Sequence, residues 1–199
     1  MMIGNYLTRF FLVMALSALF VGCVTIPKNN TVNLTRSLTY TLTAPPTGYI
    51  AKTESHLIEV SYGEQQHRFI AQVEYHQNKI AMAAISVAGA PLFDFIWRTH
   101  SPTEINQYVP LTNIDVNTII ANMQLCHWPL TQIKSAIQGP NIEVLQHSNL
   151  EDKAILWQRN IRQNKQTIIQ INKLANGFQF THLTQHYTIK LTELSQEVI

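Results

Sequence analysis

Histidine is a common metal ligand in proteins, and its spacing in this sequence decides whether a metal site is expected. The chain has eight histidines, and His182 and His186 are four residues apart. That spacing would align two ligands on one face of a helix. Both residues fall in segments with strand or turn character, however, and no third ligand has the spacing of a known zinc site. We therefore predict no metal and no cofactor.

Nucleophilic side chains give no catalytic pattern either. The sequence has no Gly-x-Ser-x-Gly motif, and Ser86 and Ser101 lack acid and base partners nearby in the chain. Cys126 follows an apolar stretch and lacks the basic surroundings of a reactive thiolate. We interpret it as a small buried hydrophobic residue. The sequence favours a protein that is not an enzyme, and a hydrolase is the least favoured of three functional hypotheses.

The N-terminus places a cysteine where a lipid could be attached. An apolar run from Phe10 to Val21 follows a short start with one basic residue, which is typical of a secretory signal. The tetrad Phe20-Val21-Gly22-Cys23 resembles the lipobox of bacterial lipoproteins, in which the cysteine thiol takes a diacylglycerol and becomes the first residue after cleavage. Phe20 departs from that pattern, since leucine is usual there. Val24 is not the aspartate that signals retention in the inner membrane, so the resemblance implies an outer-membrane anchor facing the periplasm.

An ordinary signal peptide is the alternative, with Cys23 paired to Cys126 in a disulfide. On the lipoprotein reading, residues 1–22 are the signal peptide and 23–35 a lipidated tether, marked by proline and asparagine. Residues 36–199 then form a single domain, which we expect to be monomeric. Charged residues make up only 13% of the chain and the net charge is +2, without a basic cluster. This composition argues against nucleic acid as a partner.

Alternating apolar and polar residues predict most of the domain to be antiparallel strands. In the segment 68–76 one face carries Phe69, Ala71, Val73 and Tyr75, and in 92–99 one face carries Phe93, Phe95 and Trp97. Short turns separate these segments, as in hairpins. The remaining strands are predicted at 38–42, 56–62, 79–87, 142–145, 154–160, 166–174, 178–183 and 186–194, with a hairpin turn at Asn176-Gly177.

Two helices interrupt the strands in the middle of the chain. The first begins after Asn113 or Asp115, either of which could cap it, and has apolar residues at helical spacing through Met123. His127-Trp128-Pro129 ends it. The second begins at Pro129, with Leu130, Ile133 and Ile137 as its apolar stripe, and Gly139-Pro140 stops it. The predicted fold class is therefore mainly β with some α: an antiparallel, incomplete β-barrel of about 9–11 strands with two helices inserted mid-chain.

The segment from Leu125 to Leu130 carries a resemblance to known proteins. A helix, a hydrophobic-Pro-hydrophobic break, a second helix and a stop at Gly139-Pro140 occur in the order that resembles LolB, the outer-membrane lipoprotein receptor. The Leu-x-x-Trp-Pro-Leu core resembles more closely an uncharacterised family of bacterial outer-membrane lipoproteins distantly similar to that receptor. Members of that family often lie near genes for aryl polyene pigments. The ending 187–191 also resembles the last strand of the receptor. The resemblance implies a LolA/LolB-like half-barrel whose helices cover an apolar cavity, which accepts acyl chains from a periplasmic carrier protein.

The same resemblance assigns a role to the turn Val87-Ala88-Gly89, where the receptor carries a protruding leucine that inserts cargo into the membrane. Alanine offers little apolar surface for insertion, so a different lipid-like cargo, such as a polyene lipid, fits at least as well as a lipoprotein.

The candidates for the cavity wall are equally well explained as plain core: Phe69, Val73, Tyr75, Phe93, Phe95, Trp97, Ile120, Trp128, Ile133 and Ile137. The leading hypothesis is a lipid-binding acceptor, and the alternative is a structural or accessory lipoprotein of an envelope complex.

Overall fold

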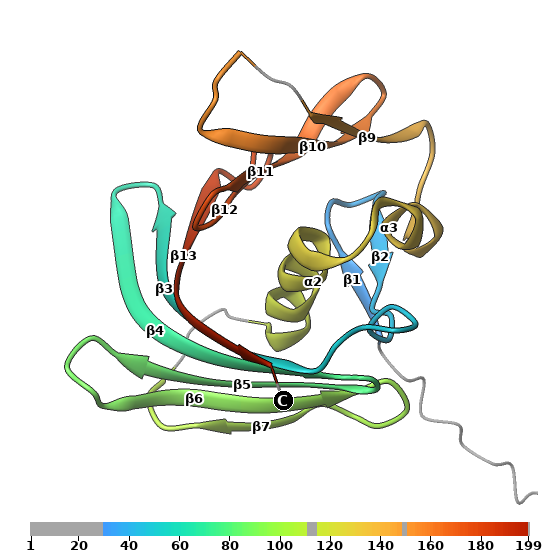
Figure 1. Cartoon of the computed structure of the whole chain (residues 1–199). Coiled ribbons are helices and arrows are strands. Elements are labelled where there is room, and N and C mark those ends of the chain that lie inside the picture. Colours follow the sequence, from blue (N-terminus) through green and yellow to red (C-terminus); the bar gives the residue numbers. More distant parts are fainter. Residues whose placement is uncertain (1–29, 111–114, 149–150, 199) are drawn as a thin grey trace, which may run out of the picture.

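The computed structural model describes residues 30–110, 115–148 and 151–198 of the chain. Their dominant feature is one large antiparallel sheet (Figure 1). Its strands are β3 (Lys52–Tyr62), β4 (Gln65–His76), β5 (Lys79–Ser86), β6 (Pro91–Arg98), β7 (Glu104–Gln107), β9 (Ile142–Ser148), β10 (Ile155–Gln163), β11 (Gln166–Leu174), β12 (Gly177–His182) and β13 (Tyr187–Val198).

The ten strands follow the order β7-β6-β5-β4-β3-β13-β12-β11-β10-β9, so almost every strand pairs with its neighbour in sequence. The exception is the pairing of β3 with β13, which joins the two halves of the sheet from Lys52–Val198 to Tyr62–Tyr187. The sheet curls strongly, and β7 and β9 are the two ends of the strand order (Figure 1). The predicted antiparallel, unclosed barrel of about 9–11 strands is confirmed.

The curl encloses two helices, α2 (Val116–His127) and α3 (Leu130–Ala136), which lie on the concave side of the sheet (Figure 1). Asp115 begins α2, since its side chain accepts a hydrogen bond from the Asn117 backbone N–H at 3.0 Å. Pro129 precedes α3, where its missing N–H costs nothing. Both helices were predicted, and Asp115 rather than Asn113, which lies outside the described residues, acts as the cap in this structure.

The second helix is shorter than predicted. Ile137 lies beyond α3, in the short strand β8 (Ile137–Gln138), where it pairs with Tyr40. Its four-residue spacing from Ile133 predicts a place on the apolar stripe of the helix, but the pairing with β2 makes it the start of a strand. Its side chain is nevertheless buried, at 8% exposure.

A small sheet packs beside the helices and corrects the predicted tether. It consists of β1 (Thr31–Asn33), β2 (Thr39–Thr41) and β8 in the order β1-β2-β8. Val32 and Leu34 are buried at 4% and 2% exposure, so residues 31–35 belong to the folded domain and not to a tether. The strand predicted at 38–42 also belongs to this small sheet, while the sequence suggested one continuous sheet. Residues 23–29 of the predicted tether, Cys23 among them, and the signal peptide lie outside the described residues.

The hairpin predicted at Asn176-Gly177 is present between β11 and β12. Gly177 has φ +148°, and a Cβ atom at this position would lie 1.9 Å from the Leu191 carbonyl oxygen on β13. Only glycine allows the third strand to approach the turn so closely.

Candidate functional site

The concave face of the sheet is the candidate site, and it is lined by the apolar residues that the alternation predicted. Phe93, Phe95 and Trp97 on β6 are all at most 3% exposed, whereas Asp94 and Arg98 between and beside them are not buried. The predicted wall residues all belong to one continuous core or pack against it. Nine of them are buried, namely Val73, Tyr75, Phe93, Phe95, Trp97, Ile120, Trp128, Ile133 and Ile137, and Phe69 is half-buried against the core.

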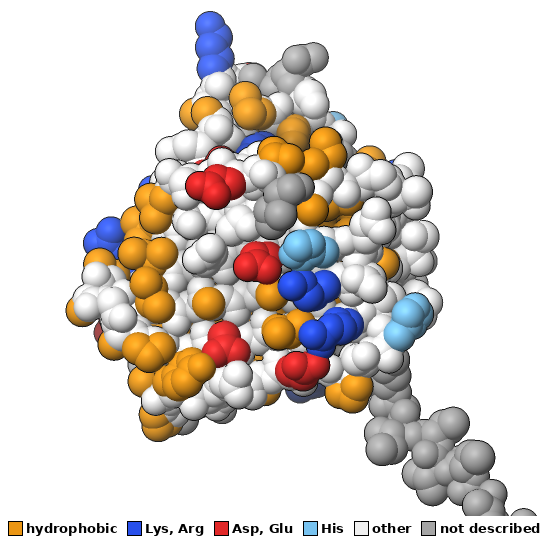
Figure 2. All heavy atoms as spheres, turned by 60° about the horizontal axis from the view of Figure 1, so that its bottom comes forward, with side chains coloured by type: hydrophobic (Ala, Val, Ile, Leu, Met, Phe, Trp, Pro, Cys, Tyr) orange, Lys and Arg blue, Asp and Glu red, His pale blue; other side chains and the backbone are white. Residues whose placement is uncertain are grey.

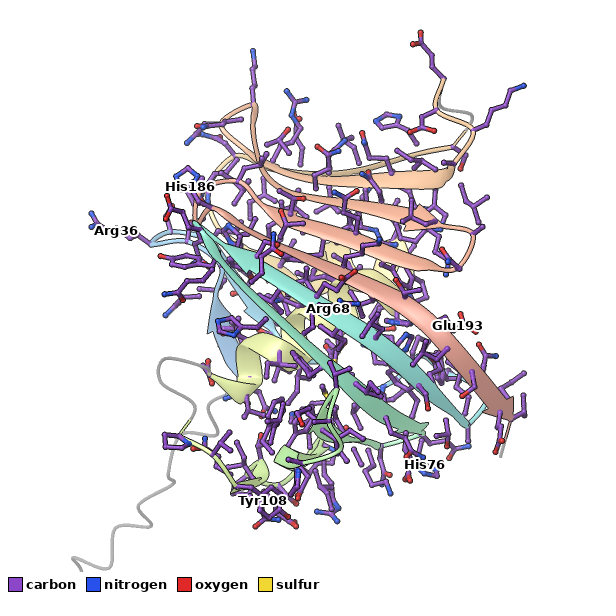
Figure 3. All side chains as sticks on the ribbon, turned by 90° about the vertical axis from the view of Figure 1, so that its left-hand side faces the viewer. Arg36, Arg68, His76, Tyr108, His186 and Glu193 are labelled. Carbon is purple, nitrogen blue, oxygen red and sulfur yellow. The ribbon has the colours of Figure 1, made fainter. Side chains whose placement is uncertain are left out.

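The convex face of the sheet has a different character. Figure 3 looks onto this face over β4, β3 and β13, where Arg68 and Glu193 lie. Arg68 Nε pairs with Glu59 at 3.1 Å, and Lys79 Nζ with Glu74 at 3.5 Å. Figure 2 shows acidic and basic side chains next to one another on the face below the sheet, with hydrophobic side chains distributed around them. The continuous apolar surface is therefore the concave one.

Cross-strand register arranges the concave face in rows that run from polar to apolar. The first row begins at Lys52 on β3 and continues through Tyr75 on β4, Ile80 on β5 and Trp97 on β6. A second row begins at Glu54 and continues through Val73, Met82 and Phe95. A third begins at His56 and continues through Ala71, Ala84 and Phe93. Because directly paired residues share a face, a polar group on the central strand β3 begins each row.

These β3 side chains form an ion-pair group in the interior. Glu54 accepts hydrogen bonds from Lys52 Nζ and from His56 Nε2, the latter at 3.1 Å. The side chains of Glu54 and His56 are only 4% and 3% exposed, while that of Lys52 reaches the surface at 20%. A buried carboxylate requires such partners, since an unpaired charge in the interior is strongly disfavoured.

The helix break brings further polar groups to the same place. The His127 ring lies 6.4 Å from that of His56 and 5.4 Å from that of Tyr75, and Trp128 lies 6.0 Å from Tyr75 and 5.4 Å from Tyr49. Lys52 Nζ lies over the Tyr75 ring at 5.5 Å. We call the following group the polar cluster: Tyr49, Lys52, Glu54, His56, His127 and Trp128.

Charge within the polar cluster is set by burial and by the ion pair. Burial alone would raise the pKa of Glu54, but the hydrogen bonds from His56 and Lys52 and the charge of the Lys52 ammonium outweigh it and lower the pKa to about 2. Burial lowers the pKa of His127 to about 3, and the attraction of Glu54 offsets only part of that effect. At neutral pH Glu54 is therefore ionised, His127 is neutral, and Glu54 is balanced by Lys52.

Several polar atoms of the cluster are buried without a hydrogen-bond partner among the described residues. They are His56 Nδ1, His127 Nε2 and Trp128 Nε1, together with the hydroxyl proton of Tyr49, whose oxygen interacts with the donor Lys52 alone. Since buried polar atoms in proteins nearly always have a partner, this concentration in one cluster marks the place where the concave face differs most from an ordinary core.

The histidine and cysteine candidates of the sequence lie elsewhere. His182 is buried in β12 with Nε2 3.0 Å from the Leu34 carbonyl oxygen, while His186 is exposed beyond the end of that strand. No group of three or more histidine, cysteine or acidic residues in the described ranges is arranged to hold a metal ion. Cys126 is a free, buried thiol whose pKa is raised to about 12 by burial, in spite of the nearby Arg159 charge, so it has no thiolate character at neutral pH.

The turn predicted to insert cargo joins β5 and β6 at the end of a hairpin. Val87 is 62% exposed, and Ala88 and Gly89 are exposed beside it. The Gly89 backbone N–H donates to the Ser86 carbonyl at 2.9 Å, and Ser86 Oγ accepts from the Ala90 N–H at 3.0 Å. The Ser86 hydroxyl therefore stabilises the turn. Across the described residues, no helix is long and apolar enough to cross a membrane.

Comparison with known proteins gives one decisive match. The profile of a family described as "Protein of unknown function (DUF3261)" matches residues 53–195. This chain belongs to the DUF3261 family. The match spans the ten strands of the large sheet and both helices of the DUF3261 fold, and it leaves out β1 and β2. The predicted membership of an uncharacterised family is confirmed.

No curated protein matches the sequence of this DUF3261 chain. Among solved structures, a domain described as an outer membrane lipoprotein-sorting protein from Vibrio parahaemolyticus aligns at 5% identity with a TM-score of 0.36. A DUF1329 family protein from Desulfovibrio piger aligns at 4% identity with a TM-score of 0.30. Each match covers 74% of this chain and 85% of the other. TM-scores below 0.5 support no conclusion about the function of this chain.

Proposed function

We propose that this chain is an outer-membrane-anchored lipoprotein whose half-barrel binds acyl chains or a lipid-like cargo and helps to place it in the outer membrane. The observation that carries the proposal is the concave face. A long sheet curls around two helices and presents to them a continuous apolar, aromatic-rich surface (Figure 1). Concave, mostly apolar surfaces with a few placed polar groups are typical of small-molecule sites.

The N-terminus supports the anchor. The proposed lipid attachment at Cys23 would hold the domain at the periplasmic side of the membrane, with acyl chains each contributing about 0.8 kcal/mol per buried methylene. The exposed turn Val87-Ala88-Gly89 is then the proposed contact with the membrane or the cargo. A periplasmic carrier protein is the proposed donor, and no catalytic step is required.

Mass spectrometry tests the proposal directly. Residues 24–199, produced in the periplasm without a tag, should carry an acyl-containing molecule in a native mass spectrum. Added fatty acid or lipopeptide should increase the mass of any remaining ligand-free protein. A clean protein mass that does not change on adding either compound would refute lipid binding.

A second candidate function is a structural or accessory lipoprotein of an envelope complex. It is favoured by the dense burial of the same wall, where Phe95, Trp97 and Ile120 are at most 1% exposed. On this reading the side chains fill the concave face and no ligand enters.

A pair of neighbouring alanines separates the two functions. Ala84 is buried on the concave face at 1% exposure, and Ala83 points outward from the same strand. In a filled core, Ala84→Leu should destabilise the fold by about 1–3 kcal/mol through overpacking, with no effect of Ala83→Leu. In a lipid-binding wall, Ala84→Leu should leave the unfolding midpoint of ligand-free protein nearly unchanged and reduce the fraction of protein that carries lipid.

A further inference from the structure

The polar cluster has an excess of buried hydrogen-bonding atoms that the described chain does not satisfy. Trp128 is 1% exposed and its Nε1 lacks a partner among the described residues, and the same holds for His56 Nδ1 on a residue exposed by 2%. An unsatisfied buried donor or acceptor is unfavourable by about the full desolvation penalty of the group. Several such groups in one place are best explained by a partner that binds there.

The chemistry of the unsatisfied atoms identifies what that partner must offer. The Trp128 indole N–H can only donate. Burial raises the pKa of Tyr49, although the charge of Lys52 and a hydrogen bond from it oppose this, so the hydroxyl stays protonated and its proton can also be donated. Two donors from neighbouring rings, whose centroids are 5.4 Å apart, suit a carbonyl oxygen, which accepts two hydrogen bonds.

The position of the polar cluster indicates the orientation of such a ligand. The rows that begin at Lys52, Glu54 and His56 become apolar on β4 and remain so to β6. Lys52 and Tyr49 are half-buried, and the neighbouring Ile50 is 68% exposed, so the polar end of the row that begins at Lys52 lies close to solvent. An elongated ligand with one polar end and an apolar tail matches this gradient.

We propose that the polar cluster is the head-group site of the concave face, where Trp128 and Tyr49 donate hydrogen bonds to the carbonyl group at the end of an acyl chain. The chain itself extends along the inner wall toward Phe95 and Trp97. The carbonyl belongs to a fatty acid, an ester or an amide, and all three present the same acceptor. This inference rests on the proposed acyl-binding function and adds the polarity and the recognising residues.

Position-specific photolabelling tests the orientation in the protein as it exists. Cell envelopes containing the full chain are irradiated with palmitic acid or its methyl ester, each carrying a diazirine either beside the carbonyl group or beside the terminal methyl group. Labelled peptides are then identified by mass spectrometry. We expect the carbonyl-side diazirine to label the segments that carry Tyr49 and Trp128, and the methyl-side diazirine to label β5 and β6.

Removing one donor at a time tests the recognising residues. Trp128→Phe and Tyr49→Phe keep a ring and delete the donor, and each should reduce labelling about fivefold, the effect of one hydrogen bond. Trp157→Phe and Tyr62→Phe are matched controls, since Tyr62 is 59% exposed and Trp157 lies outside the polar cluster. A difference between acid and ester identifies which carbonyl compound is preferred.

The outcomes separate this proposal from the function on which it rests. Labelling of the inner wall in the same pattern by both probes, unchanged in the two variants, would refute the head-group site and leave lipid binding intact. Absence of any labelling on the concave face would refute acyl binding itself. If Trp128→Phe does not accumulate, the orientation map of the unaltered chain and the Tyr49→Phe variant still decide.

Discussion

Replacing His127 by phenylalanine should remove a defined part of the sensitivity of this fold to acid. His127 contacts the rings of Tyr75 at 5.4 Å and Phe178 at 4.8 Å, and phenylalanine preserves such ring packing. The substitution deletes a side chain that is held neutral by burial, with a pKa lowered from 6.5 to about 3. Below pH 6.5 the unfolded chain binds a proton at this position and the native chain does not, so stability falls with pH until the pKa of the folded state is reached.

The size of the effect follows from that shift. At pH 4.5 the unfolded histidine lies two pH units below its pKa and the folded one remains neutral, which corresponds to a loss of about 3 kcal/mol relative to neutral pH. Urea unfolding at pH 7 and pH 4.5 measures it. The unaltered chain should lose about 3 kcal/mol more than His127→Phe between these two conditions. The loss from Glu54 begins near pH 4.5 and extends toward pH 2, so it contributes little at pH 4.5 and equally in both proteins.

An exposed histidine provides the control. His67 is exposed on β4, and His67→Phe should retain the acid sensitivity of the unaltered chain. Parallel pH dependences for the unaltered chain and His127→Phe would show that His127 is not held neutral in the interior, and the description of the polar cluster would then be wrong.

Three further predictions concern the framework around the site. Gly177→Ala should destabilise the fold by at least about 2 kcal/mol in chemical unfolding, because the added methyl group meets the Leu191 carbonyl. Gly63→Ala is the control, since a Cβ atom there would lie in open space. It should destabilise the fold by about 1 kcal/mol, mainly because alanine is disfavoured at φ +58°. Arg159→Met should lose about 2 kcal/mol, since its guanidinium donates to the carbonyl of Leu125 at 2.5 Å in the last turn of α2; an unchanged unfolding midpoint would exclude this capping role. Cys126 should resist iodoacetamide at pH 8 in the folded chain and react in urea, and rapid labelling without denaturant would contradict its burial.

The sequence predicted the concave wall well because its apolar residues alternate with polar ones. Phe93, Phe95 and Trp97 are separated by polar or half-exposed residues, and strand and face both follow from that period. β7 was missed because all four of its residues are exposed, which leaves no alternation to detect. β1 was missed for a similar reason: in Thr-Val-Asn only the central residue is buried.

The polar cluster could not be predicted because its members contradict the pattern on which the strands were identified. In β3, Glu54 and His56 point inward while Leu57 is only half-buried, so the usual assignment of polar residues to the outside fails. Their partners, Tyr49 and His127, are far apart in the sequence. One signal was present, since His127 and Trp128 stand directly before Pro129, where a helix must end and its last side chains face the adjoining strands.

The pairing of β3 with β13 has a consequence for the order in which the chain can fold. Strands β3 to β7 can form hairpin by hairpin as they are synthesised, and so can β9 to β12, because each pairs with its neighbour in sequence. The two halves, however, join only through Tyr187–Val198. This pairing spans most of the chain and closes its longest loop, so it is the slowest contact to form. Until those last residues are synthesised, the edges of β3 and β12 that β13 joins remain unpaired, and a nascent chain stalled before β13 would expose two strand edges prone to aggregation.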